Sequence, residues 1–352
     1  MTRRVRGRAS VAAAVFLLLI ATVVVRRLGD DDGGVHEFVG PSMGTLYTVS
    51  VDADLSEGER PHIAAAIEAK LARVTDLMST YDSDSEISRF NRHESTEPFT
   101  LSPETMDVLL MAHEISERSR GAFDVTVGPL VDAWGFGPSP VVAPVPDSAA
   151  LAALLPLVDY RGLALDQATR TATKGDPRMR VDPTAIAQGY AAEAVADTLR
   201  ALGLANFLVD VGGELRAVGT RRDGRAWRVG VERPDGVEGS VAGTIDLTDE
   251  GIDTSGDYRN YFEEGGVRYA HLIDPRTGQA VRVRDASVTV VHDDTAMADA
   301  WATALMVLGP EEGWEVALRA GLAAVFLTAV NGRIETRVTP AMAERFEPAE
   351  ER

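Results

Sequence analysis

The sequence has 352 residues, enough for a large core, and its 45% hydrophobic and 25% charged residues are an ordinary globular mixture. A formal net charge of −19 argues against nucleic acid as a partner, because binding phosphates requires a basic face. The chain has no cysteine, which excludes disulfides, thiolate nucleophiles, iron–sulfur clusters and a lipoprotein anchor acylated on cysteine.

Residues 1–28 are predicted to form a signal anchor. Leading arginines precede an apolar run at 9–25, about as short as a membrane-spanning helix can be. Only Arg26 and Arg27 follow it, so the charge bias keeps the N-terminus cytoplasmic. We therefore expect a protein of the cell membrane whose body is extracytoplasmic, after a linker at 29–37. A cleaved signal peptide, giving a secreted protein, is the alternative.

The body begins with a predicted strand and helix. Alternating residues at 43–51 predict a strand. Apolar residues at helical spacing predict an amphipathic helix over 59–78. The segment 78–91 is dense in Ser, Asp and Asn, which favours a helix end and a turn. Its Tyr81 could also stack on a planar ring, although the plain turn is the simpler interpretation.

Glycine and proline mark the next candidate site. Ser102 and Pro103 predict the start of a second helix, which ends at Gly121. In 121–138, glycines and prolines are interleaved with aromatic residues, and glycines let the backbone approach a ligand closely. Asp124 lies among apolar neighbours there, so we expect it to be paired or exposed.

The residues 181–203 predict a strand end, a turn and a helix. Asp182 lies at the strand end, and Gly189 indicates close packing against the helix. The segment 206–219 is predicted to be one strand, whose Gly-Gly pair is typical of a bulge or a close backbone approach. Two further strands then lead into a hairpin.

That hairpin, at 254–278, is the centre of the candidate site. Alternating aromatic and polar residues run into His271, Asp274 and Pro275, where the chain turns sharply. A proton-transfer group and a carboxylate are thereby held on a stiff turn, a common position for functional residues. The same residues also fit a generic turn with a satisfied histidine, so the local pattern leaves both interpretations open.

A buried strand at 286–294 and an apolar helix at 295–309 follow. Asp299 is the one carboxylate of that helix, and Thr303 lies four residues later on the same face. Such an Asp must be bonded, neutralised or on a cation, and oxygen-only ligation favours Mg²⁺. An Asp bonded to a backbone N–H is an equal alternative. Together the elements suggest the α+β class, with mixed, mostly antiparallel sheets packed with helices.

Five separated segments together resemble the ApbE family of FAD:protein FMN transferases: 41–45, 78–91, 121–137, 181–219 and 254–309. A set this long, in order along the chain, is far more specific than any single motif. The resemblance implies an ApbE-like, T-fold-like catalytic domain, which we place at 38–345, before a tail at 346–352. It also implies an exported, Mg²⁺-dependent enzyme that transfers FMN from FAD, through a phosphoester, to a Thr or Ser hydroxyl. The acceptor would be an exported or membrane flavoprotein, and AMP would be released.

The resemblance assigns roles to individual residues. His271 falls on a motif histidine implicated in the transfer chemistry, and Asp299 would serve both catalysis and the metal. The implied metal site combines Asp299 with Thr303 and the carbonyl of Ala185. The implied FAD site comprises Met43, Tyr81, Ala122, Phe123, Asp124, Asp182, Gln188 and Ile273.

Two positions depart from the family pattern. Gln188 stands where the family often has Lys, and Ala302 stands where some members have Asp, so we expect one metal site with fewer carboxylates. Two other functions stay open on the sequence. An FAD pyrophosphatase would use water in place of the protein hydroxyl. A non-catalytic exported flavin-binding protein should lack metal ligands, which the presence of Asp299 and Thr303 disfavours.

Overall fold

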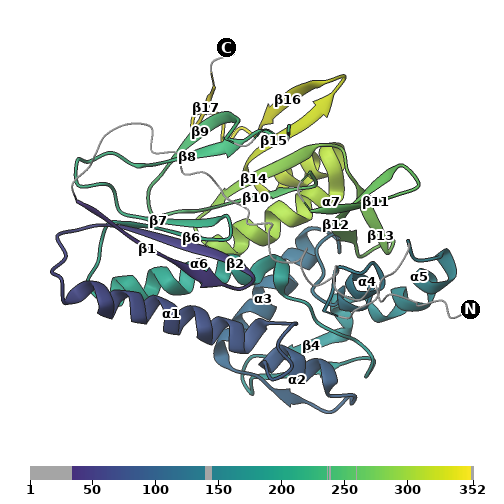
Figure 1. The fold of residues 1–352 in the computed structure, drawn as a ribbon. Helices are drawn as coiled ribbons and strands as arrows, with labels where there is room; N and C mark the ends of the chain where they lie inside the picture. Colours follow the sequence, from purple (N-terminus) through teal and green to yellow (C-terminus); the bar gives the residue numbers. More distant parts are fainter. Residues whose placement is uncertain (1–33, 139–144, 236, 238, 259, 350–352) are drawn as a thin grey trace, which may run out of the picture.

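The computed structural model describes residues 34–138, 145–235, 237, 239–258 and 260–349. Its centre is an eight-stranded sheet in the order β1-β2-β6-β7-β10-β14-β15-β16, in which all neighbouring strands are antiparallel (Figure 1). The strands of this sheet are β1 Val35–Ser42, β2 Thr45–Asp52, β6 Phe207–Val211, β7 Glu214–Val218, β10 Gly251–Gly256, β14 Ala286–His292, β15 Ala323–Val330 and β16 Arg333–Val338.

Helices cover one face of this sheet and a small sheet covers the other. Two helices pack directly on the strands and two more pack against those helices: α6 Thr184–Ala201 and α7 Thr295–Ala320, then α1 Glu59–Met78 and α3 Pro103–Arg118. On the opposite face, the sheet β17-β9-β8 shares a second hydrophobic cluster with the large sheet. Its strands are β8 Trp227–Glu232, β9 Val241–Leu247 and β17 Phe346–Pro348.

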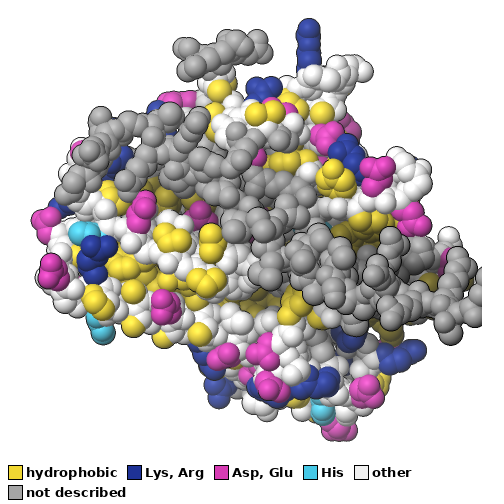
Figure 2. All heavy atoms as spheres, viewed as in Figure 1, with side chains coloured by type: hydrophobic (Ala, Val, Ile, Leu, Met, Phe, Trp, Pro, Cys, Tyr) yellow, Lys and Arg dark blue, Asp and Glu magenta, His cyan; other side chains and the backbone are white. Residues whose placement is uncertain are grey.

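Two further three-stranded sheets, three short α-helices and two 3₁₀ helices, at Leu155–Leu157 and Tyr160–Gly162, complete the described part of the chain. The sheets are β3 Phe99–Thr100, β5 Thr171–Lys174 and β4 Leu163–Asp166, and β11 Tyr261–Glu264, β12 Val267–Asp274 and β13 Gln279–Arg282. The short helices are α2 Glu86–Arg92, α4 Gly128–Ala133 and α5 Ser148–Leu154. A third cluster of buried apolar residues joins α4 and α5 to β12 and β13. On the face drawn in Figure 2, acidic and basic side chains are interspersed among hydrophobic ones.

The α+β class, with helices packed on antiparallel sheets, is confirmed. The helix predicted over 59–78 is α1, and its apolar positions, such as Ile67 and Leu71, are buried. Ser102 caps α3 by accepting a hydrogen bond from the Thr105 N–H at 3.2 Å, as its sequence position predicted. The predicted helix end at Gly309 is also found, as a break inside α7 where Gly309 has a φ of 79°.

Three boundaries are corrected. The predicted linker at 29–37 overlaps β1, because residues from Val35 onward pair in register with β2. The predicted tail includes β17, since Phe346 is buried and pairs with β9. The single strand predicted at 206–219 is a hairpin of β6 and β7, because both central glycines, Gly212 and Gly213, take positive φ and turn the chain back.

Two more predicted segments are the turn at 78–91 and the signal anchor at 1–28. The segment 78–91 contains a turn, as predicted, but also α2, whose start is capped by Ser85. The predicted signal anchor at 1–28 lies outside the described residues. Among the residues that the structure describes, no helix is both long and apolar enough to cross a membrane.

Candidate active site

Every residue assigned to the catalytic, FAD and metal sites lines one large cavity. The chain reaches it from the turn between β1 and β2, the C-terminal end of α1, the loop before α4, the start of α6, the strand β12 and the first half of α7. Residues from 43 to 303 thus meet in one place. The structure confirms this proximity, while the role of each residue stays a prediction.

Asp299 and Ala185 are brought together by the close packing of α6 on α7. A Cβ atom on Gly189 would lie 2.5 Å from the Thr295 carbonyl oxygen and 2.8 Å from the Asp299 Cβ, so only glycine allows this spacing. The Gly189 N–H donates to Asp299 Oδ2 at 3.0 Å. In a regular helix that N–H would bind the Ala185 carbonyl, four residues earlier. Ala185 also has non-helical dihedral angles, which turn its carbonyl away from the helix axis.

Thr303 follows Asp299 by one helical turn and lines the same cavity. The donors are then a carboxylate, a hydroxyl and a carbonyl, the hard oxygen ligands that Mg²⁺ prefers. Among the described residues, no group of three His, Cys, Asp or Glu side chains is close enough to hold a metal by itself. A cation here would therefore depend on backbone, hydroxyl and water oxygens, which suits Mg²⁺ because this ion keeps several waters.

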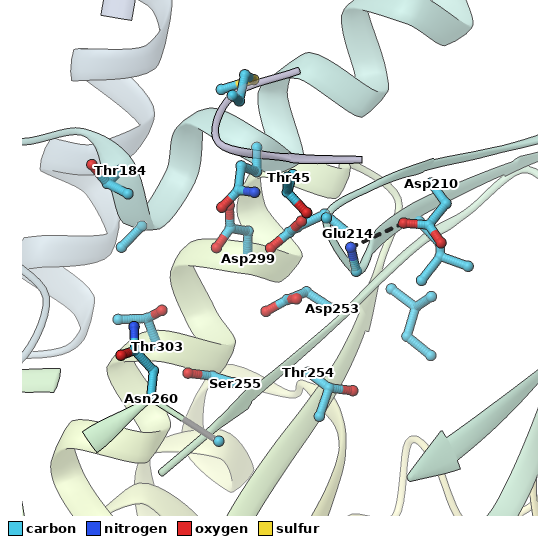
Figure 3. Close-up of a pocket in the computed structure, with 18 of the residues that line it drawn as sticks. Thr45, Thr184, Asp210, Glu214, Asp253, Thr254, Ser255, Asn260, Asp299 and Thr303 are labelled. Atoms are coloured by element: carbon cyan, nitrogen blue, oxygen red, sulfur yellow. Dashed lines mark hydrogen bonds between the residues drawn. The ribbon is translucent and has the colours of Figure 1, made fainter. Parts of the chain in front are cut away.

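Two more acidic side chains converge on Asp299 from the sheet. Figure 3 shows Glu214 of β7 and Asp253 of β10 pointing toward the same part of the cavity as Asp299. Asp253 is 5% exposed, and Glu214 Oε2 is buried without a hydrogen-bond partner. Burial raises the pKa of Asp299 to about 7. Burial, followed by repulsion from Asp299, raises the pKa of Asp253 well above its ordinary value.

The β6–β7 turn holds Glu214 in position. Asp210 Oδ1 accepts a hydrogen bond from the Gly213 N–H at 2.9 Å, which closes the hairpin (Figure 3). A Cβ atom on Gly212 would lie 2.4 Å from Gln188 Nε2 and 3.2 Å from Glu214 Oε2, so the turn, the amide and the carboxylate are tightly packed. Burial raises the pKa of Asp210 to about 6.

His271 has one ring nitrogen fixed by the backbone. Its Nδ1 lies 3.1 Å from the carbonyl oxygen of Asn260, and its own backbone N–H donates to the same oxygen at 3.0 Å. Because a carbonyl only accepts, Nδ1 carries the proton and Nε2 keeps a free lone pair. Burial lowers the pKa of His271, so the neutral ring dominates at pH 7. The ring is therefore prepared to accept a proton.

An aromatic cluster lies beside His271, and two of its rings, Phe136 and Phe262, line the cavity. The cluster also contains Tyr269 and Trp134, and neighbouring rings are stacked or tilted with centroids 5.4 to 6.2 Å apart. The Tyr81 hydroxyl donates to the Phe136 carbonyl at 3.1 Å, while 58% of Tyr81 is exposed. The free face of Tyr81 can therefore receive a planar ring.

The other predicted FAD residues also line the cavity. Both Asp124 oxygens accept protein hydrogen bonds, from Thr126 at 2.6 and 2.7 Å and from the Tyr160 N–H at 2.8 Å. Of the two predicted alternatives, paired or exposed, the structure shows that Asp124 is paired. Ala122 and Phe123 are buried, and Met43 lies in the β1–β2 turn with a positive φ of 49°, which a non-glycine residue adopts at an energetic cost. Asp182 Oδ1 accepts from Thr184 at the start of α6.

A sequence model of the ApbE family matches residues 43–326. The chain belongs to the ApbE family. Among curated relatives, the FAD:protein FMN transferase of Vibrio cholerae serotype O1 is 43% identical over 278 residues, which cover 79% of this chain and 83% of the relative. The corresponding protein of Klebsiella pneumoniae is 37% identical over 303 residues, covering 86% of each.

Solved structures of the ApbE family share the fold. The flavin transferase ApbE from Vibrio cholerae has a TM-score of 0.81 and 37% identity, over 88% of this chain and 99% of that one. The apo form of the Pseudomonas stutzeri flavinyl transferase ApbE has a TM-score of 0.80 and 35% identity, over 90% and 98% of the two chains. The ApbE-like fold that the motifs implied is therefore confirmed.

Sequence reasoning about this ApbE-family chain did not single out Glu214, Asp253 or the Asn260 carbonyl. Glu214 directly follows the Gly-Gly pair, whereas Asp253 lies in the mostly polar stretch 249–255. The Gly-Gly pair marks the position of Glu214, but no local pattern shows that the two acids approach Asp299. The Asn260 carbonyl has no such signal, because any residue supplies a backbone oxygen.

Proposed function

We propose that this chain is an Mg²⁺-dependent FAD:protein FMN transferase that modifies a Thr or Ser hydroxyl of an exported or membrane flavoprotein and releases AMP. That it is a flavin transferase follows from its family. The finer statement is supported chiefly by one observation: the neutral His271 and the oxygen donors around Asp299 line the same cavity. A base and a cation site are the two devices that transfer of a phosphoryl group to a hydroxyl requires.

FAD would bind with a planar ring against the exposed face of Tyr81 and its chain along the cavity. The loop at 122–124 would form part of the cavity wall, where Ala122 and Phe123 are buried and Asp124 is occupied by protein donors. In this proposal, Gln188 contributes an uncharged amide at the α6 side of the cavity.

Asp299, Thr303 and the Ala185 carbonyl would hold Mg²⁺. When bound, the ion neutralises pyrophosphate charge and stabilises the departing phosphate oxygen of AMP. The Gly189 N–H fixes the Asp299 carboxylate, so its free oxygen is oriented before the ion arrives. This preorganisation reduces the ordering that binding would otherwise require.

His271 would act as the general base. The acceptor hydroxyl gives its proton to Nε2 while its oxygen forms a bond to the FMN phosphorus. The bond from that phosphorus to the bridging oxygen breaks, and AMP leaves with this oxygen and its electron pair. The proton then passes from His271 to the product phosphate or to water. No covalent enzyme intermediate is needed, because attack and departure are in line.

The deciding experiment combines the full-length chain in detergent with FAD, Mg²⁺ and a flavin-acceptor domain bearing a Thr or Ser site. Intact mass should show an FMN-sized gain on the acceptor, abolished by EDTA. Free FMN and AMP beside an unmodified acceptor would favour the pyrophosphatase. FAD bound but unchanged would favour the flavin-binding protein. If His271→Ala kept the full rate while Asp299→Ala lost it, His271 would not be the base.

Export is part of the proposal and rests on the arginines and apolar run of residues 1–28. Fusing residues 1–40 to a reporter enzyme that is active only outside the cytoplasm should give activity in the membrane fraction. Activity in the culture medium would instead support cleavage of the segment. An inactive reporter with a cytoplasmic fusion protein would refute export.

A further inference from the structure

We propose that Glu214 and Asp253 belong to the cation site of this chain, where they bind the metal through water molecules that the ion retains. The inference rests on the proposed function and extends it. It adds two carboxylates, from β7 and β10, to donors that otherwise come from α6 and α7. The ligand would be a hydrated divalent cation such as Mg²⁺ or Mn²⁺.

The first observation is an unsatisfied oxygen. Glu214 Oε2 is buried and has no hydrogen-bond partner, although a buried carboxylate oxygen without one costs substantial free energy. The β6–β7 turn holds the Glu214 side chain in place, because Asp210 closes the hairpin and Gly212 packs against Gln188. The neighbouring Gln188 amide carries no charge. This oxygen therefore lacks a hydrogen-bond donor, which the waters of a bound cation would supply.

The second observation is the balance of charge. In the part of the chain that the structure describes, none of the three carboxylates of Asp299, Asp253 and Glu214 forms an ion pair with a Lys or Arg. Other acids of this interior do: Glu193 pairs with Arg216 at 3.3 Å. Three converging carboxylates with no basic partner repel one another in a poorly solvated place. A divalent cation at their centre converts that repulsion into attraction.

The arrangement indicates contact through water rather than direct ligation by all three acids. No three acidic side chains among the described residues are close enough to hold a metal directly. Mg²⁺ dehydrates reluctantly and is usually bound by one or two carboxylates together with several waters. Asp299 provides the direct carboxylate, and Glu214 and Asp253 accept hydrogen bonds from the bound waters. Such outer partners commonly tune metal affinity.

Direct cation binding tests the inference without catalysis. Mn²⁺ binding to the full-length chain, freed of FAD and metal, would be followed by the paramagnetic resonance signal of free Mn²⁺. Glu214→Gln and Asp253→Asn should each raise the Kd about 10-fold or more, the usual effect of losing an outer-sphere partner. The control is Asp246→Asn, an exposed acid of the same cavity whose carboxylate is paired with Arg228 at 2.7 Å. It should bind Mn²⁺ like the wild type.

Circular dichroism would first establish that each variant is folded, and either variant alone can carry the test. Wild-type affinity in the folded Glu214→Gln and Asp253→Asn proteins, with binding lost in Asp299→Ala, would overturn this inference and leave the proposed function intact. A wild-type protein that binds no Mn²⁺, with or without FAD, would overturn the metal dependence in the proposed function and this inference with it. An equal loss of Mn²⁺ affinity in Asp246→Asn would mean that the affinity depends only on the total charge of the cavity. That result would also overturn the inference.

Discussion

Two sets of buried carboxylates in this protein behave differently. Asp257 is fully buried, and its two oxygens accept backbone hydrogen bonds from Ala286 and Arg284, both at 2.8 Å. Both carboxylate oxygens of Asp124 likewise accept hydrogen bonds from the protein. Around Asp299, by contrast, the Gly189 N–H donates to Asp299 Oδ2, but Glu214 Oε2 has no hydrogen-bond partner among the described residues. A satisfied buried acid holds the backbone in place, whereas an unsatisfied group of acids indicates a ligand that the protein is built to receive.

The largest effect is expected at Asp299. Asp299→Ala removes the direct carboxylate of the proposed cation site, so FMN transfer should fall about 10²–10³-fold, the range seen when one electrostatic stabiliser is lost. The measurement is the initial rate of acceptor modification at saturating FAD. Full activity in this variant would mean that the cation binds elsewhere. The acids around Asp299 would then differ from Asp257 in their hydrogen bonding but not in function.

Cation binding should also stabilise the fold. Because the ion binds the native site and not the unfolded chain, Mg²⁺ at about 100 times its Kd should raise the free energy of unfolding by about 2.7 kcal/mol. Urea unfolding with and without Mg²⁺ measures this gain. Asp299→Ala should show none of it, whereas Asp257→Asn should show all of it. A gain of equal size in Asp299→Ala would mean that Mg²⁺ acts away from this site.

For Asp257, whose oxygens are already hydrogen-bonded, we expect the opposite result: a substitution should change stability but not cation binding. Asp257→Asn places an NH₂ group against a backbone N–H and leaves that donor unpaired, which should destabilise the fold by about 1–3 kcal/mol. Urea unfolding without added cation gives the value. Mn²⁺ affinity of the folded variant should be unchanged. A weakened affinity would show that the two sets of acids are not independent.

The smallest expected effect is a pH dependence set by His271. Only its neutral ring accepts a proton, and burial lowers its pKa from the ordinary 6.5. Transfer should therefore be constant above about pH 6.5 and fall only as the pH drops through the lowered value. The profile should be measured at saturating Mg²⁺, because acid also protonates the carboxylates near Asp299. A rate that already falls between pH 8 and 7 would assign the base to another group.

Local patterns predicted much of the fold. The spacing of apolar residues located α1, and the Ser-Pro pair located the start of α3, because each depends on neighbours a few residues apart. The β6–β7 hairpin was missed because its alternation continues through Gly212 and Gly213, and only the pairing of the two strands reveals the turn. Strand β1 was missed, because it is defined by its pairing with β2 and part of it was predicted to be a linker.

The candidate site likewise contains residues that local motifs predict and residues that only the tertiary structure reveals. The motifs around Tyr81, Asp124, His271 and Asp299 are each local, and the structure brings them to one cavity. The importance of Glu214 and Asp253 is not local, since it arises only when strands distant in sequence carry both acids toward α7. The tautomer of His271 depends on a backbone oxygen. Neither kind of information is contained in a short stretch of sequence.

The contact between α6 and α7 has a consequence for how this protein can diverge. Any side chain at residue 189 would collide with the Thr295 carbonyl and Asp299, so substitution there would separate two groups that must stay together. Residue 188, directly before it, lines the cavity. In the proposed FAD site, a substitution of Gln188 would change the group that faces the nucleotide, while Gly189 keeps the spacing of α6 and α7 constant.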